Sequence, residues 1–155
     1  MLEKEIKILE IDHEAVVQKL ESLGAKKSFE GFIHDVYYDF LDEEGHKLEL
    51  NGRMFRLRKK GEEHIYTIKN KRKKIKKQEG VIAKDEHETS ITDIERFSKV
   101  LEKYGMTKTR EKKKHRISYQ LQNMEFDIDF YEGIPEFLEI EGPSGEAIQS
   151  WVTKL

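Results

Sequence analysis

The sequence predicts an α+β fold in which helices cover a closed antiparallel β-barrel, and three observations lead to this prediction. Segments that alternate apolar and polar residues recur along the 155-residue chain, as expected for strands with one buried face. Glycines and an Asn-Gly pair separate these segments and favour hairpin connections. Several polar faces carry charges of one sign, and barrel closure brings such faces together in one interior.

The first element is a strand over residues 2–11, in which charged and apolar side chains alternate. Its charged side carries Glu3, Glu5 and Lys7. Asp12 then provides the N-cap of a helix, and Gly24 provides its C-terminal stop. Apolar residues recur along this helix at helical spacing, so we expect it to cover the apolar side of the sheet.

Further strands and two further helices follow in the chain. The predicted strands are residues 33–40, 53–58, 65–69, 81–89, 113–120, 125–131 and 136–141. The second helix begins near Thr92, because Thr92 and Glu95 have the spacing of a capping box. The third helix follows Pro143 and Ser144.

A shift of the chain by 81 positions indicates an internal repeat. The shift aligns several identical residues, among them Leu20 with Leu101, Gly24 with Gly105, His34 with His115 and Tyr38 with Tyr119. Continued without a gap, it places Glu5 on Glu86 and residues 55–60 on residues 136–141. The sequence therefore predicts two similar halves.

Composition narrows the possible functions. Charged residues make up 39% of the chain but the net charge is only -2, which excludes a basic nucleic-acid coat and an acidic tail. The absence of cysteine excludes disulfides, thiolate metal sites and a cysteine nucleophile. The N-terminal segment lacks the apolar run of a signal peptide, and no stretch approaches membrane-spanning length. We therefore expect a single domain over residues 1–155 that is soluble and cytoplasmic.

Charged residues at every second position form rows of one sign on the predicted strands. The acidic rows are Glu3 and Glu5, Glu86 and Glu88, Glu125, Asp127 and Asp129, and Glu139 and Glu141; the basic residues are Arg56 and Arg58, Lys112, Lys114 and Arg116, and singly Lys7, Lys69 and Lys84. A solvated strand face explains any one row, whereas the combination across strands favours a charged interior. Crowded carboxylates call for a hard divalent cation, and guanidinium and ammonium groups suit phosphate oxygens.

Motifs along most of the chain support one family resemblance. They are Glu3-x-Glu5-x-Lys7, Asp35-Val-Tyr-Tyr-Asp39, Arg56-x-Arg58, Thr67-Ile-Lys69, Lys84-x-Glu86-x-Glu88, Lys114-x-Arg116, Asp127-x-Asp129 and Phe137-x-Glu139-x-Glu141. The first resembles the ExExK signature of the CYTH superfamily, also called triphosphate tunnel metalloenzymes, and the others follow in the order of that family. The resemblance implies an eight-stranded antiparallel tunnel with pseudo-two-fold symmetry. One departure is Gly133-Ile134-Pro135, where the family often has Gly-Leu-Gly.

The same resemblance implies roles for individual residues. The implied metal ligands, for one or two Mg²⁺ or Mn²⁺ ions, are Glu3, Glu5, Asp127, Asp129, Glu139 and Glu141. The implied triphosphate contacts are Lys7, Arg56, Arg58, Lys69, Lys84, Lys114 and Arg116. Glu3, Glu5, Lys7, Glu139 and Glu141 are the implied catalytic residues, and Glu86 and Glu88 are expected to orient basic residues or help hold a second metal.

The expected activity is metal-dependent hydrolysis of a linear triphosphate, which is tripolyphosphate, a nucleoside triphosphate or thiamine triphosphate. Two alternatives stay open. In one, the 3′-hydroxyl of ATP attacks the α-phosphorus, as in the class IV adenylyl cyclases of the family. In the other, the chain binds polyphosphate or a nucleotide without turnover.

The basic segment Lys69–Lys77 is expected to be a solvated hairpin or a lid over an anionic substrate. It lacks the interleaved aromatic residues that stack on the bases of single-stranded nucleic acid. The predicted partner is therefore a small molecule that contains a triphosphate, with no membrane and no nucleic acid. The oligomeric state, monomer or homodimer, is left open.

Overall fold

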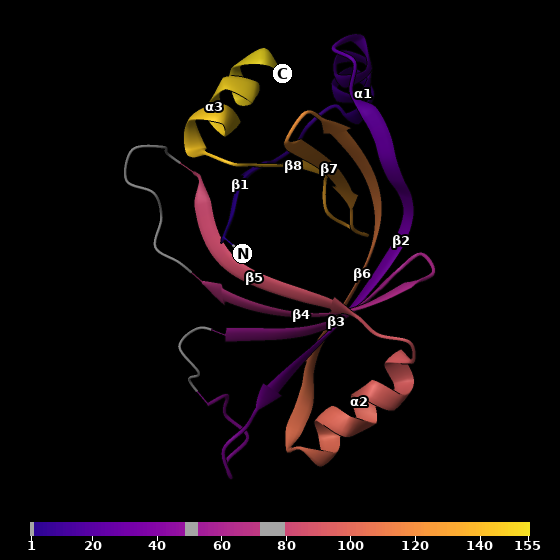
Figure 1. Ribbon diagram of the computed structural model, residues 1–155, viewed down its shortest axis with the longest axis vertical. Coiled ribbons are helices and arrows are strands. Elements are labelled where there is room, and N and C mark those ends of the chain that lie inside the picture. Colours follow the sequence, from indigo (N-terminus) through magenta and orange to yellow (C-terminus); the bar gives the residue numbers. More distant parts are fainter. Residues whose placement is uncertain (1, 49–52, 72–79) are drawn as a thin grey trace. The chain divides into compact units, whose positions relative to one another are not determined.

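The computed structural model describes residues 2–48, 53–71 and 80–155 (Figure 1). In these residues the elements are β1 Leu2–Ile8, α1 His13–Ser22, β2 Lys26–Phe40, β3 Arg53–Lys60, β4 Glu63–Lys71, β5 Ile82–Ser90, α2 Ile94–Lys103, β6 Met106–Leu121, β7 Met124–Phe130, β8 Phe137–Gly142 and α3 Gly145–Lys154. Leu41 and Lys47 add an isolated antiparallel bridge. None of the helices in the described residues has the length and apolar character of a membrane span.

The strands are hydrogen-bonded in the order β1-β5-β4-β3-β2-β6-β7-β8, which closes a barrel. The strand pairs β1 with β8, β2 with β3, β3 with β4, β6 with β7 and β7 with β8 are all antiparallel. The predicted α+β fold, an eight-stranded antiparallel barrel with helices, is thus confirmed.

Some element boundaries differ from the prediction. β2 and β6 begin at Lys26 and Met106, each seven residues earlier than predicted, because their first halves are mostly exposed and lack an apolar face. The second helix is capped by Asp93, whose carboxylate accepts a hydrogen bond from the Arg96 amide at 3.1 Å. The expected Thr92 cap is therefore wrong by one residue. Asp12 caps α1 as predicted, and Ser144 provides the N-cap of α3.

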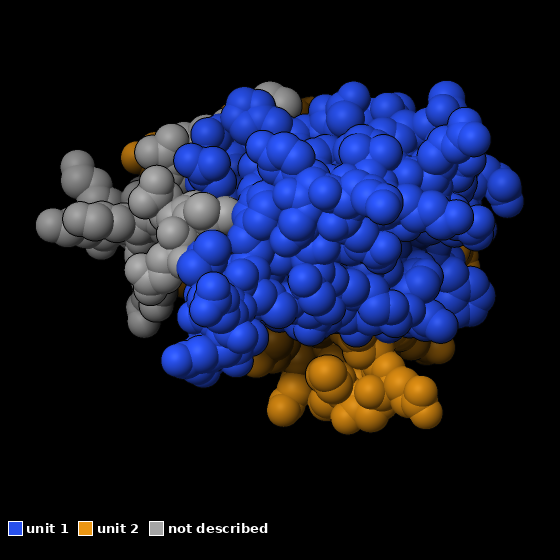
Figure 2. Space-filling model, turned by 90° about the horizontal axis from the view of Figure 1, so that it is seen from below, with its two compact units in different colours: residues 1, 32–71, 85–113 blue, residues 2–31, 72–84, 114–155 orange. Residues whose placement is uncertain are grey.

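The chain divides into two compact units, which Figure 2 colours separately. Unit 1 comprises Met1, Phe32–Lys71 and Asp85–Lys113. Unit 2 comprises Leu2–Gly31, Arg72–Lys84 and Lys114–Leu155. Each unit has its own apolar cluster.

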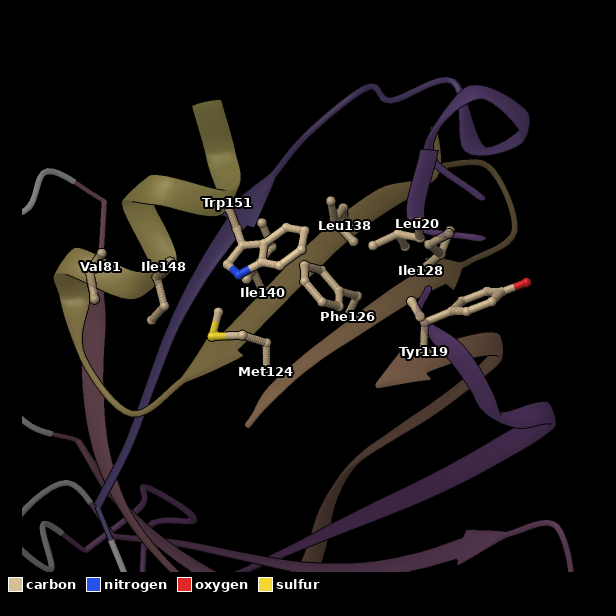
Figure 3. Packing of buried hydrophobic residues seen from close by; sticks show 11 residues of the cluster. Leu20, Val81, Tyr119, Met124, Phe126, Ile128, Leu138, Ile140, Ile148 and Trp151 are labelled. Carbon is tan, nitrogen blue, oxygen red and sulfur yellow. The ribbon is translucent and has the colours of Figure 1, made fainter. Parts of the chain in front are cut away.

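The core of unit 2 lies between α3 and the strands β7 and β8 (Figure 3). Its buried side chains include Leu20 of α1, Phe126 and Ile128 of β7, Ile140 of β8 and Trp151 of α3. The Trp151 and Phe126 rings meet edge to face, with centroids 5.1 Å apart. Because this face of the strands is covered, their charged residues lie on the opposite face.

The core of unit 1 forms where α2 contacts β3. Tyr38, Leu57 and Leu101 are buried in it, and Phe97 of α2 meets Tyr66 edge to face at 4.9 Å. These apolar residues alternate along β2 and β3 with Asp35, Arg56 and Arg58, which therefore lie on the other face.

The internal repeat is visible in the element boundaries. A shift of 81 positions carries α1 onto the bounds of α2 and brings β1 onto β5 and β2 onto β6 within one residue. β3 pairs with β2 as β7 pairs with β6, so β3 corresponds to β7. The ungapped alignment of residues 55–60 with residues 136–141 is therefore wrong. The β2–β3 connection spans residues 41–52, ten residues more than Gln122–Asn123 between β6 and β7.

Core packing in unit 2 gives a stability prediction. Ile140 is fully buried, so we expect Ile140→Ala to lower the free energy of unfolding by about 2–5 kcal/mol. The matched control is Ile134→Ala, because Ile134 is 56% exposed and should change stability by less than about 0.5 kcal/mol. Urea unfolding followed by circular dichroism measures both; equal losses would contradict the assignment of this core.

Candidate functional site

In each unit the charged residues lie on the face of the strands that the helices leave uncovered. In unit 1, Arg58 of β3 and Asp35 of β2 are register partners. Arg58 Nε donates to Asp35 Oδ1 at 2.7 Å and Arg58 Nη2 donates to Asp35 Oδ2 at 2.9 Å. Both side chains are almost fully buried, and the two parallel hydrogen bonds fix the plane of the guanidinium.

Arg56, two residues before Arg58, has a different environment. Its side chain is only 6% exposed, and its Nη2 donates to Thr67 Oγ1 at 3.3 Å. The nearest oxygens of Asp35, Glu86 and Glu88 lie at 3.9–4.0 Å, which is outside hydrogen-bond range. Among the described residues, Arg56 Nε has no hydrogen-bond acceptor. A buried guanidinium in this state is suited to receive an anion.

Lys69, Glu86 and Glu88 complete the charged cluster of unit 1. Lys69 Nζ lies 2.6 Å from Glu86 Oε2. A hydrogen bond with Glu86, with added contributions from burial and from the Glu86 charge, raises the pKa of Glu88 although Arg56 and Arg58 oppose the shift. Glu86 and Glu88 therefore form a carboxyl pair that holds a proton more tightly than an isolated glutamate.

Unit 2 contains the corresponding buried cluster on β6 and β7. Asp129 is fully buried and accepts from Arg116 Nε at 2.6 Å, Arg116 Nη2 at 2.8 Å and Lys114 Nζ at 2.8 Å. Burial alone would raise the pKa of Asp129, but these partners outweigh it and hold the pKa below its usual value. Burial likewise opposes the charged form of Arg116, whose pKa is nevertheless raised by Asp129, Asp127 and Glu139.

Asp127 and Glu139 lie beside this cluster and make fewer polar contacts with the described residues of unit 2 than Asp129 does. Ser118 Oγ donates to Asp127 Oδ1 at 2.5 Å, and Arg116 Nη1 lies 3.3 Å from Asp127 Oδ2. Glu139 Oε1 lies 3.6 Å from Lys7 Nζ. Asp127 and Glu139 are register partners, so two carboxylates and one ammonium group occupy neighbouring strands.

A row of three carboxylates crosses the same face of unit 2. Glu141 of β8 is the register partner of both Glu5 of β1 and Glu125 of β7. Like charges directly opposite each other on neighbouring strands are destabilising, and a divalent cation removes the repulsion. Carboxylate oxygens are also the donors that Mg²⁺ and Mn²⁺ prefer. The donor chemistry of this row therefore fits such an ion.

In the described part of the chain, no three acidic or histidine side chains converge as a ready-made metal cage. Mg²⁺ in particular is commonly held by one or two carboxylates together with waters and substrate phosphates. The carboxylate row, with Asp127 and Glu139 beside it, matches that open kind of site. Glu3, which is half-buried in β1, extends the acidic set by one position on the same face.

Two aromatic rings hold lysines of unit 2. Tyr131 and Phe137 are stacked, with their ring planes 13° apart. Lys7 Nζ lies 4.8 Å from the Phe137 centroid and Lys114 Nζ lies 5.5 Å from the Tyr131 centroid. These cation–π contacts restrain two of the ammonium groups that the sequence predicted as phosphate contacts.

The structure brings together the predicted residues within each unit. Arg56, Arg58, Lys69, Glu86 and Glu88 form one cluster, and Lys7, Lys114, Arg116, Asp127, Asp129 and Glu139 form another. Lys84 belongs to β5, but its side chain lies outside the described residues. Residues 72–77 of the predicted basic segment Lys69–Lys77 lie outside them as well.

Sequence patterns missed several contributors to these clusters. Asp35 belongs to the motif Asp35-Val-Tyr-Tyr-Asp39, and its position on a predicted strand was the available signal. Thr67 and Ser118 carry no charge, so no charge pattern marks them. Their contacts to Arg56 and Asp127 are visible only from the register.

Comparison with known proteins gives consistent results. A family model of the CYTH domain matches residues 1–154. The protein named "Putative adenylate cyclase" of Methanocaldococcus jannaschii is 30% identical over 142 residues, which cover 91% of this chain and 77% of that protein.

Solved structures resemble the chain in fold. A structure named as a putative adenylate cyclase from Vibrio parahaemolyticus has a TM-score of 0.82 at 18% identity. The alignment covers 99% of this chain and 88% of the Vibrio chain. A putative adenylyl cyclase from Hippeastrum, described as having a dominant triphosphatase activity, has a TM-score of 0.69 at 19% identity, with 97% and 84% covered. At these identities the likeness shows the fold.

The raised pKa of Glu88 predicts a pH-dependent stability. The folded chain keeps a proton that the unfolded chain releases near pH 4.5, so this stabilisation is complete below pH 4.5 and is lost as the pH rises through the raised pKa. Glu88→Gln imitates the protonated form, so we expect it to melt at the same temperature as the wild type near about pH 4 and at a higher temperature near about pH 7.5. Glu62→Gln in the exposed β3–β4 turn is the control. A Glu88→Gln variant that is less stable at the higher pH would contradict this prediction.

The buried pair of Asp35 and Arg58 predicts strong coupling. Asp35→Ala leaves the Arg58 guanidinium buried without its main partner and should lower the free energy of unfolding by about 3–5 kcal/mol. The double variant Asp35→Ala with Arg58→Met should lose less than the sum of the two single variants. Chemical denaturation of all four proteins gives the coupling energy. Additive losses would show that the two side chains do not act as a pair.

Proposed function

The chain belongs to the CYTH domain family, and from this membership together with its charged clusters we propose that it hydrolyses a linear triphosphate with the help of a divalent cation. Enzymes of this family are metal-dependent and include triphosphatases and adenylyl cyclases.

The observation that carries the proposal is the state of Arg56. Its guanidinium is buried, yet the surrounding carboxylates stop short of hydrogen-bond distance and Nε has no acceptor among the described residues. An unmade hydrogen bond of a buried charged group is costly unless a ligand supplies the acceptor. Phosphate oxygens match the planar guanidinium group of arginine, and they provide both negative charge and hydrogen-bond acceptors.

The proposed triphosphate contacts are Lys7, Arg56, Arg58, Lys69, Lys84, Lys114 and Arg116. Several of these groups are already held in place by a carboxylate or an aromatic ring, which lowers the entropic cost of arranging them around a highly charged substrate.

The proposed metal ligands are Glu3, Glu5, Glu139 and Glu141, with Asp127 or Asp129. When bound, the ion neutralises charge on the phosphate oxygens and makes the phosphorus a better target for attack. The choice of Mg²⁺ or Mn²⁺ rests on the oxygen donors of the site.

In the proposed reaction a water oxygen attacks the terminal phosphorus in line with the bond to the next phosphate. A carboxylate of the Glu139 and Glu141 pair, or of the Glu3 and Glu5 pair, orients this water and takes its proton. The bond between the terminal phosphorus and the bridging oxygen breaks, and the products are diphosphate and phosphate. The basic side chains stabilise the charge that develops on the leaving diphosphate.

A second candidate function is the formation of cyclic AMP. The names of the relatives from Methanocaldococcus jannaschii and Vibrio parahaemolyticus favour it. The same phosphate contacts would serve a reaction in which the ribose 3′-hydroxyl attacks the α-phosphorus and pyrophosphate leaves. Hydrolysis asks for no base-recognition site, and the dominant triphosphatase activity described for the Hippeastrum relative favours it.

The two reactions are separated by their products. We expect wild-type protein with Mg²⁺ or Mn²⁺ to release phosphate from tripolyphosphate, ATP or thiamine triphosphate. Arg56→Ala should lower kcat/KM by about 10- to 150-fold, the equivalent of one lost hydrogen-bonded charge contact. Arg53→Ala is the matched control, because Arg53 is an exposed arginine on the same strand.

Each outcome of this experiment is informative. Cyclic AMP formed from ATP faster than phosphate is released would favour the cyclase. Binding of tripolyphosphate without turnover would favour a binding module. Equal activities of Arg56→Ala and Arg53→Ala would remove Arg56 from the site.

A further inference from the structure

In the described residues of each unit, an arginine is held by both oxygens of a single aspartate. In unit 1 the pair is Arg58 with Asp35, and in unit 2 it is Arg116 with Asp129. Both pairs are buried, both use Nε and Nη2, and both join register partners on neighbouring antiparallel strands.

The two pairs occupy equivalent positions of the internal repeat with the charges exchanged. The shift of 81 positions carries Asp35 onto Arg116. Their register partners are Arg58 and Asp129, so these two positions correspond as well. The acidic residue is on the earlier strand in unit 1 and on the later strand in unit 2. What the two units share is the buried ion pair, while the strand that provides the guanidinium differs.

The carboxylate of Asp129 accepts more hydrogen bonds from protein donors than the carboxylate of Asp127 does. Three hydrogen bonds from two cations reach its two oxygens, and the residue has no exposed surface. A metal ion would have to displace an arginine or a lysine from it. Asp127 accepts one short hydrogen bond from Ser118 and lies farther from Arg116, so it keeps acceptor capacity.

We infer that Asp35 and Asp129 are positioning residues, which hold Arg58 and Arg116 for the triphosphate, and that Asp127 is the aspartate that binds the metal. The inference rests on the proposed function, since it divides the roles within that site. An arginine that is already fixed in its plane loses little side-chain entropy when a phosphate arrives. Each fixed arginine is also neutralised by its aspartate, whereas Arg56, among the buried arginines that the structure describes, keeps an Nε donor without an acceptor.

A charge-conserving substitution tests the positioning role. Asp35→Glu and Asp129→Glu keep the charge but displace the paired guanidinium by the length of one methylene, so a change in anion affinity reports its position. We expect each to raise the Kd for tripolyphosphate by about tenfold or more, because misplacement by about 1 Å is costly in a preorganised site. Asp42→Glu, in the exposed turn after β2, is the matched control. Calorimetric titration with tripolyphosphate measures all three.

The metal role is tested on the same proteins without turnover. Binding of Mn²⁺ alone, followed by electron paramagnetic resonance, should be unchanged within about twofold in Asp129→Glu and weakened about tenfold or more in Asp127→Glu. Equal weakening of Mn²⁺ binding in these two variants would overturn the inference. So would unchanged tripolyphosphate affinity in both Asp35→Glu and Asp129→Glu.

An exchange variant covers the case in which the longer side chain at position 129 prevents folding. Arg116→Asp together with Asp129→Arg restores an ion pair but starts the guanidinium from β7. We expect the double variant to melt well above either single variant while its tripolyphosphate affinity stays weakened. Full recovery of affinity would show that the pair is only structural. Wild-type protein that binds tripolyphosphate without hydrolysing it would refute the proposed reaction, while the binding measurements would still decide the roles of the aspartates.

Discussion

A charge removed from water must be paired, and this constraint organises both units of the chain. An isolated buried ion costs far more free energy than one domain can spare. Arg58 with Asp35 on β3 and β2, and Arg116 with Asp129 on β6 and β7, satisfy the constraint by bonding across neighbouring strands. The pairing depends on strand register, so correct alignment of the strands and correct pairing of the charges are the same requirement.

The apolar faces of the strands explain why the charges lie where they do. Side chains alternate between the two faces of a strand, so covering one face with a helix leaves every second residue for the other face. In unit 2 the covering side chains come mainly from α3, with Trp151 against Phe126. In unit 1 they come from α2, with Phe97 against Tyr66. The helices thus contribute to the charged clusters without supplying a residue to them.

Within each cluster, residues of the same type have different hydrogen-bond partners. Arg56 and Arg58 are two positions apart on one strand and point to the same face, yet Arg58 has a bidentate partner and Arg56 has an unmet donor. Asp127 and Asp129 differ in the same way on β7. In both cases the difference comes from the neighbouring strand, where residue 35 or residue 116 lies in register. Because their hydrogen-bond partners differ, one residue of each type is fixed by the protein while the other can bind a ligand.

The sequence by itself determined which segments form strands, although not where β2 and β6 begin, and it determined most helix ends, the rows of charge and the family. These features are local, because the alternation of side chains, the capping residues and the charges at every second position each involve residues that are close together in the sequence. It also determined the repeat of 81 positions as far as β2 and β6. Only the tertiary structure showed that the second strands of the repeat are displaced by ten residues, because a connection can change length without altering any local pattern. For the same reason it alone decided which arginine meets which aspartate, since these partners lie 23 and 13 residues apart and the register between strands brings them together.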